Sequence, residues 1–120
     1  MPWSFSSDRP IYAQLVERLQ TAIVTGQYPP GSRLPSVREL AETAAVNPNT
    51  MQRALAELES RGLVCAQRTA GRLVTEDAAQ IAALRKQLAR AAAERFLREM
   101  AELGFQRSEV IPLLQEEELT

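Results

Sequence analysis

Two helix start signals stand close together in the middle of the chain, at Ser36 and at Asn47. Glu39 follows Ser36 at the spacing of a capping box, in which each side chain accepts a hydrogen bond from a free backbone N–H. Asn47 is a favourable N-cap, and Pro48 suits the first position of a helix. Since only a tight turn fits between the two helices, the sequence predicts a helix-turn-helix whose second helix covers about residues 48–61.

A further helix is predicted ahead of this pair, because apolar residues recur at every fourth position: Ile11, Leu15, Leu19 and Ile23. We expect Asp8 or Ser7 to cap this helix, Pro10 to lie in its first turn, and Gly26 to end it. Residues 28–35 contain three prolines and one glycine. Because such a segment cannot form a regular helix, it predicts a turn-rich connection.

The hydrophobic period changes after Gly62. Residues 63–67 and 72–75 resemble two short strands, and Gly71 in the link between them can adopt a positive φ. A two-stranded hairpin is marginal alone, so we expect it to pack on the helices as a wing at about residues 63–75. Cys65, in the first strand, is expected to be a small buried hydrophobe rather than a redox sensor.

The remainder of the chain predicts two more helices. No proline or glycine occurs from about Asp77 to Leu103, and strong helix formers fill this stretch. A short last helix is expected to start at Ser108 as N-cap, with Pro112 in its first turn. The predicted fold is therefore mainly α with a small β-hairpin (α+β). It consists of a winged helix-turn-helix at residues 1–75 and a helical tail at residues 76–120, which forms a two-helix dimerisation hairpin.

The overall charge argues against a nucleic-acid partner until it is divided along the chain. Lys and Arg together number 14 and Asp and Glu 15, for a net charge of −1. Residues 1–75 hold eight arginines and six acidic residues, a net of +2, whereas residues 76–120 hold six basic and nine acidic residues, a net of −3. This asymmetry is expected if only the first segment meets a polyanion.

Composition also excludes several chemistries. The chain has no histidine and one cysteine, so it cannot form a His-dependent catalytic triad, a Cys/His metal cluster or an internal disulfide. The first residues lack a basic segment followed by an apolar one, so we expect no signal peptide, and no apolar run is long enough to predict a transmembrane helix. We expect a cytoplasmic protein that is not an enzyme and that binds no metal, cofactor or membrane.

The predicted fold fits DNA recognition, because a helix can enter the major groove and present the side chains near its N-terminus to base edges. Arg38 could instead pair with Glu42, and Arg53 with Glu57, on solvated helix faces. The arginines beside the wing tip could be ordinary hairpin surface, and the Asn47 side chain is first of all a helix cap. The candidate DNA-contacting residues are Arg33, Arg38, Asn47, Asn49, Thr50, Gln52, Arg53, Arg68 and Arg72.

Residues 10–75 resemble the winged helix-turn-helix domain of the GntR family of bacterial regulators. The matching runs are Pro10-Ile11-Tyr12 with Gln14-Leu15, Pro30-Gly31-Ser32-Arg33-Leu34-Pro35-Ser36-Val37-Arg38-Glu39-Leu40-Ala41, Val46-Asn47-Pro48-Asn49-Thr50, Arg53-Ala54-Leu55 with Leu58-Glu59, and Gly62-Leu63-Val64. The short tail resembles that of the YtrA subfamily, whose members append two dimerising helices. The resemblance implies a homodimer that binds an inverted repeat in double-stranded DNA. It further implies a repressor of nearby genes, often transporter genes, with Arg38 as a base contact.

Two positions depart from the family pattern. Ala45 stands where the turn of the family often has glycine, so this turn must avoid a strongly positive φ or accept strain. The wing reads Arg68-Thr69-Ala70-Gly71-Arg72, where members often have another glycine and a threonine. The resemblance therefore does not fix the contacts of the wing.

The apolar residues of the tail predict a dimer interface. They form two stripes on the long helix, one of which we expect to meet the winged domain or a second subunit and the other the last helix. A monomer with a folded-back tail is the alternative. A small apolar effector could bind between paired tails, or the regulator could be controlled by its abundance alone. The predicted interface residues are Ile81, Leu84, Leu88, Ala92, Phe96, Met100, Leu103, Ile111 and Leu114.

Overall fold

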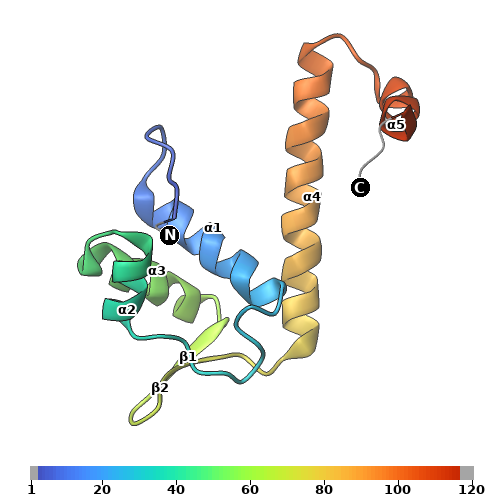
Figure 1. Cartoon of the computed structure of the whole chain (residues 1–120). Coiled ribbons are helices and arrows are strands. Elements are labelled where there is room, and N and C mark those ends of the chain that lie inside the picture. Colours follow the sequence, from blue (N-terminus) through green and yellow to red (C-terminus); the bar gives the residue numbers. More distant parts are fainter. Residues whose placement is uncertain (1–2, 117–120) are drawn as a thin grey trace. The chain divides into compact units, whose positions relative to one another are not determined.

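The computed structural model describes residues 3–116 and contains five helices and one hairpin within them (Figure 1). This confirms the predicted mainly helical fold. The chain forms two compact units, one up to Leu84 and one from Arg85 onward. The elements in chain order are α1 (Ile11–Val24), α2 (Val37–Ala44), α3 (Pro48–Ser60), β1 (Val64–Gln67), β2 (Gly71–Val74), α4 (Ala78–Glu102) and α5 (Arg107–Glu116).

Both helix start signals of the helix-turn-helix are confirmed. The backbone N–H of Glu39 donates to Ser36 Oγ at 3.1 Å, and the N–H of Ser36 donates to Glu39 Oε1 at 3.1 Å, which completes the capping box of α2. Asn47 Oδ1 accepts from the N–H of Asn49 at 2.7 Å, and Pro48 is the first residue of α3. α2 and α3 therefore begin where their caps dictate.

The turn between α2 and α3 accepts strain at Ala45. This residue has φ 59° and ψ 47°, and it is the one non-glycine residue with a positive φ in the described part of the chain. The conformation ends α2, because the N–H groups of Ala45 and Val46 bend back to Glu42 O and Ala41 O. The turn keeps the left-handed geometry that suits glycine, although a Cβ is present.

The prediction that Asp8 or Ser7 caps α1 is wrong. Pro10 occupies the N-cap position with ψ 138°, and no side chain caps the helix. Because the helix begins after Pro10, Asp8 and Ser7 lie too far along the chain to reach its first N–H groups. Gln14, which is buried, instead fastens the N-terminal arm: its Nε2 donates to Ser6 O at 2.8 Å, and its Oε1 accepts from the N–H of Ser6 at 2.8 Å.

The hairpin has a third partner that the sequence did not predict. β1 and β2 pair antiparallel in a register that places Val64 opposite Val74. The N–H of Leu34 donates to Arg72 O at 2.9 Å, and the N–H of Val74 donates to Ser32 O at 2.8 Å. The proline-rich connection thus runs along the free edge of β2 and supports a hairpin that would be marginal alone.

The prediction for Cys65 is wrong, because this side chain is exposed. Its neighbour Val64 and the facing Val74 are buried. Successive side chains of a strand point to opposite faces, so Cys65 must point away from the core that Val64 enters.

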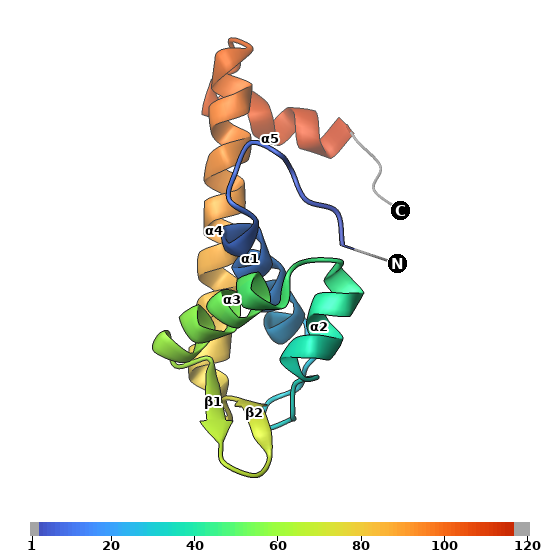
Figure 2. The same cartoon turned by 90° about the vertical axis from the view of Figure 1, so that its left-hand side faces the viewer.

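The core of the first unit joins α1, α2, α3 and the hairpin, which lie together in both views (Figure 2). Ile81 and Leu84, near the start of α4, are partly buried against this core. Two residues predicted for a dimer interface therefore pack on their own chain. The first compact unit extends beyond the boundary expected near residue 75 because these two side chains belong to its core.

The second unit contains the rest of α4 and α5. Gly104, with φ +90°, ends α4. Within the described residues, the buried side chains of this unit are Met100 in α4 and Val110 in α5. Glu109 Oε1 accepts from the N–H of Gln106 at 2.9 Å, so α5 starts at Arg107 and not after a Ser108 cap. Pro112 consequently lies inside the helix, beyond the first turn where it was expected. None of the described helices is long and apolar enough to span a membrane.

Candidate nucleic-acid interface

α3 presents a polar face that the domain leaves uncovered. Its apolar side chains Met51, Ala54, Leu55 and Leu58 are buried in the core. At about 100° per residue, Asn49, Gln52 and Arg53 lie on the opposite side of the helix, and all three are exposed. Ala56 shares this face and is also exposed, a residue that the sequence reasoning missed. Its small side chain leaves room for close approach of a ligand to the helix.

Two other predicted contacts, Thr50 and the N-cap residue Asn47, lie at the start of α3. The side chain of Thr50 is half-buried. Asn47 Oδ1 accepts the capping hydrogen bond of α3, which fixes the orientation of this side chain and leaves its amide NH₂ available for another partner. Asn47 therefore fixes where the helix begins, and the exposed residues one turn later are freer to bind.

Arg53 does not form the alternative ion pair with Glu57. Glu57 instead accepts from Arg61 Nε at 2.8 Å, a hydrogen bond that holds the pKa of the Glu57 carboxyl below its usual value. The guanidinium of Arg53 lies over the ring of Tyr12 in α1, with its Cζ 3.7 Å from the ring centroid. Tyr12 is a second residue that sequence reasoning missed. The available signal was an aromatic residue one position off the apolar stripe of α1.

Arg38 is available at the start of α2. It is the second residue of the helix and is exposed. It makes no hydrogen bond or ion pair within residues 3–116, so the alternative pairing with Glu42 does not form there. The neighbouring Glu39 is held by the capping box, and its hydrogen bonds with the Ser36 backbone and then the Ser36 side chain lower the pKa of its carboxyl.

Of the three arginines in and beside the wing, one is bound to another residue and two are exposed. Arg72 Nε donates to Glu59 Oε1, and this ion pair fastens β2 to α3. Arg68 is exposed in the turn of the hairpin. Arg33, on the third segment, is also exposed, and a Cβ added at Gly71 would lie 3.4 Å from its Nε. Arg33 and Arg68 thus lie in the wing region, and Arg72 is bound between the wing and α3, the predicted recognition helix.

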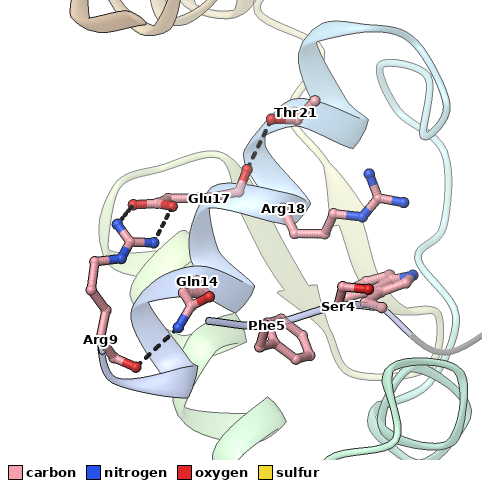
Figure 3. A pocket seen from close by; sticks show the side chains of 8 residues that line it. Ser4, Phe5, Arg9, Gln14, Glu17, Arg18 and Thr21 are labelled. Carbon is pink, nitrogen blue, oxygen red and sulfur yellow. Dashed lines mark hydrogen bonds and ion pairs between the residues drawn. The ribbon is translucent and has the colours of Figure 1, made fainter. Parts of the chain in front are cut away.

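A separate hollow of about 590 Å³ lies between the N-terminal arm and α1 (Figure 3). Arg9 donates to both carboxylate oxygens of Glu17, at 2.8 and 2.7 Å, and Gln14 Nε2 donates to Arg9 O at 2.9 Å. The Arg18 guanidinium lies 5.2 Å from the centroid of the Trp3 ring. Since these groups bind one another, we interpret the hollow as the place where the N-terminal arm is fastened to α1 and not as a ligand site. The described residues contain no cluster of side chains suited to a metal ion.

The uncovered polar face of α3, the capped α2 before it and the braced hairpin after it define a winged helix-turn-helix DNA-binding domain. Residues 11–74 match the family model described as "Bacterial regulatory proteins, gntR family". The chain belongs to the GntR family of DNA-binding transcriptional regulators.

Two curated relatives from Bacillus subtilis (strain 168) agree with this assignment. The uncharacterized HTH-type transcriptional regulator YhcF is 38% identical over 107 residues, which cover 89% of this chain and 88% of YhcF. The HTH-type transcriptional repressor YtrA is 40% identical over 72 residues, which cover 60% of this chain and 55% of YtrA. Both relatives are named as transcriptional regulators.

Two solved structures resemble the fold. A GntR family transcriptional regulator from Listeria monocytogenes has a TM-score of 0.86 and 41% identity, over 95% of this chain and 100% of that one. The DNA-binding domain of AraR in complex with operator ORX1 has a TM-score of 0.54 and 28% identity, over 62% of this chain and 92% of that domain. One of the structures that the domain resembles was therefore solved in complex with operator DNA.

Proposed function

We propose that the chain is a homodimeric repressor that binds an inverted-repeat operator near its own gene. In this proposal α3 enters the major groove, and the wing contacts the flanking backbone or minor groove. Arg38, Asn49 and Gln52 read base edges, whereas Arg53 and the exposed arginines of the wing region contact phosphate. Control of an adjacent operon follows from an operator in that position.

The uncovered face of α3 is the observation that carries the DNA-binding role. A surface helix with Asn49, Gln52 and Arg53 on one side and four buried apolar residues on the other offers hydrogen-bonding groups that the domain itself does not use. Amide side chains suit adenine and arginine suits guanine or phosphate. A module that bound only another protein would be expected to present an apolar face here.

The dimer is supported by the apolar surface of the second unit. Every large hydrophobic side chain that is exposed in the described part of the chain belongs to this unit: Phe96, Leu103, Phe105, Ile111 and Leu114. Several large apolar side chains exposed on one small unit are typical of an interaction surface. Phe105 was not among the predicted interface residues. A symmetric pair of subunits would require two half-sites in opposite orientation, which accounts for an inverted repeat. The repressor role rests on the similarity to YtrA.

DNA footprinting on the region upstream of the gene tests the proposal. We expect protection of two half-sites whose centres lie about 10 base pairs, or a multiple of this, apart. Asn49→Ala/Gln52→Ala should abolish the footprint, whereas the matched change Gln115→Ala in α5 should preserve it. Transcription from the protected promoter should fall when the protein is present. Equal affinity for the upstream fragment and for random DNA would instead favour a protein-interaction module.

A further inference from the structure

The stack between Arg53 and Tyr12 joins two helices at the edge of the DNA-facing surface. The Arg53 Cζ lies 3.7 Å above the centroid of the Tyr12 ring, which is the contact distance of stacked planar groups. Tyr12 is the second residue of α1, and its ring is partly buried against the core of the first unit. The ring is thus fixed by the domain, and it fixes the guanidinium in turn.

Stacking uses only the face of the guanidinium. The five N–H donors of arginine lie in the plane of the group and point outward from its edge. Arg53 makes no hydrogen bond or ion pair with any other residue of the described chain, so these donors are available. Arginine loses considerable rotamer freedom when it binds. A guanidinium that is already held in place loses less of this freedom on contact with DNA.

The position of the stack on α3 favours a backbone phosphate over a base edge as the partner of Arg53. Tyr12 draws Arg53 toward α1, to the side of α3 that carries Thr50, and away from Gln52 on the opposite flank. A hollow of about 330 Å³ lies there, lined by Pro10, Ile11, Tyr12, Asn49, Thr50 and Arg53. The flanks of a helix in the major groove face the sugar-phosphate walls, whereas its centre faces the base edges. The hydroxyl of Thr50 and the amide of Asn49 supply further groups that can donate to an anion.

We propose that Tyr12 is a positioning residue that holds the Arg53 guanidinium ready to bind a phosphate of the operator backbone. This rests on the proposed DNA-binding function and assigns a role within it. Arg53 supplies the charge, and Tyr12 supplies the orientation without contributing charge. Removal of each residue should therefore change different properties of the binding reaction.

Affinity and its salt dependence separate the two roles. On a duplex carrying the footprinted operator, Tyr12→Leu should weaken binding about 2- to 5-fold, and Tyr12→Phe, which keeps the ring, should bind like the wild type. Arg53→Ala should weaken binding to operator and random duplex alike and reduce the slope of log K against log salt by about 1. Tyr12→Leu should leave this slope unchanged, because the charge of Arg53 is still present.

The double variant and a matched tyrosine complete the test. Tyr12→Leu should have no further effect in the Arg53→Ala background. Tyr28→Leu, the same change at another half-buried tyrosine packed on the core, should lower stability without weakening DNA binding. The inference is overturned if Tyr12→Phe binds as weakly as Tyr12→Leu, or if the losses of Tyr12→Leu and Arg53→Ala add in full. Failure of the wild type to prefer the operator would instead refute the proposed function itself.

Discussion

A single methyl group strains the turn of the helix-turn-helix. Ala45 adopts φ 59° and ψ 47°, where the Cβ of an L-residue approaches the following carbonyl oxygen. We predict that Ala45→Gly raises the free energy of unfolding by about 0.5–1 kcal/mol, because the relief of strain exceeds the added freedom of the unfolded chain. Urea denaturation measures this change. Ala82→Gly, on the exposed side of α4, should have the opposite sign, and a loss of stability in both variants would show that Ala45 is not strained.

Arg38 tests whether a side chain at the start of α2 reads sequence. It is exposed and has no partner within residues 3–116. We predict that Arg38→Ala lowers affinity for the operator by about 1–3 kcal/mol and lowers affinity for random DNA much less, because base contacts carry the discrimination. Competition binding with both duplexes measures the two losses. Equal losses would make Arg38 a phosphate contact.

The sequence predicted local features at the residue scale well and tertiary ones poorly. The caps at Ser36 and Asn47 are set by neighbours within three positions, and both are confirmed. The burial of Cys65 depends on which face of the hairpin meets the core, and its prediction was wrong because short apolar strands do not reveal that face. Arg53 could be assigned to an exposed face but not to Tyr12, since this contact joins residues that are distant in the sequence.

At the scale of elements, the capping box makes the stability of α2 dependent on pH. The pKa of Glu39 is lowered in the folded protein, first by the backbone N–H of Ser36 and then by its side chain. Its stabilising contribution is therefore present above the unfolded pKa, about 4.3, and is lost as the pH falls through the lower folded value. We predict that Glu39→Gln reduces the loss of stability with acid over this interval, as urea denaturation between pH 3 and 7 would measure.

A control separates the box from the charge at the helix end. Ser36→Ala removes the hydroxyl that accepts from the N–H of Glu39 and should cost about 1 kcal/mol at pH 7. Glu39→Gln should cost less at that pH, because glutamine can also accept in a capping box. If the free energies of unfolding of the wild type and of Glu39→Gln fall in parallel down to pH 3, the Glu39 carboxylate does not control the loss of stability in acid.

Element bounds were predictable where a cap or a glycine sets them and less so where packing does. α3 and the hairpin fall close to the expected positions, because Pro48, Gly62 and Gly71 punctuate the chain there. The third segment beside β2 was missed, since backbone pairing of residues 32–34 leaves no periodic signal. The ion pair of Arg72 with Glu59 was missed because it joins side chains that are distant in the sequence, and it braces the wing on α3.

For the whole molecule, the compact units change the meaning of the charge balance. The first unit, residues 1–84, includes Glu76 and Asp77, so it holds eight basic and eight acidic residues and is neutral. Its attraction to DNA therefore cannot come from net charge and must come from where the arginines stand. Exposed Arg33, Arg38, Arg53 and Arg68 lie on the elements of the interface, whereas Glu57 and Glu59 are each bound to an arginine. Weak non-specific binding and strong dependence on the recognition helix are the expected result.

Dimerisation gives the last prediction, and it concerns the second unit. Leu103 and Ile111 are 73% and 61% exposed, so charged replacements should leave the unit folded, whereas Met100 and Val110 are buried and could not be replaced in this way. We predict that Leu103→Glu/Ile111→Glu shifts the mass measured by light scattering from twice the chain mass to the single-chain value of 13.3 kDa. Affinity for the two-half-site operator should fall steeply, because the second half-site no longer binds at a high effective concentration. Affinity for a single half-site should not change. Gln87→Glu, an exposed charge-adding change on α4, is the control that should stay dimeric, and a wild type of single-chain mass would refute the dimer.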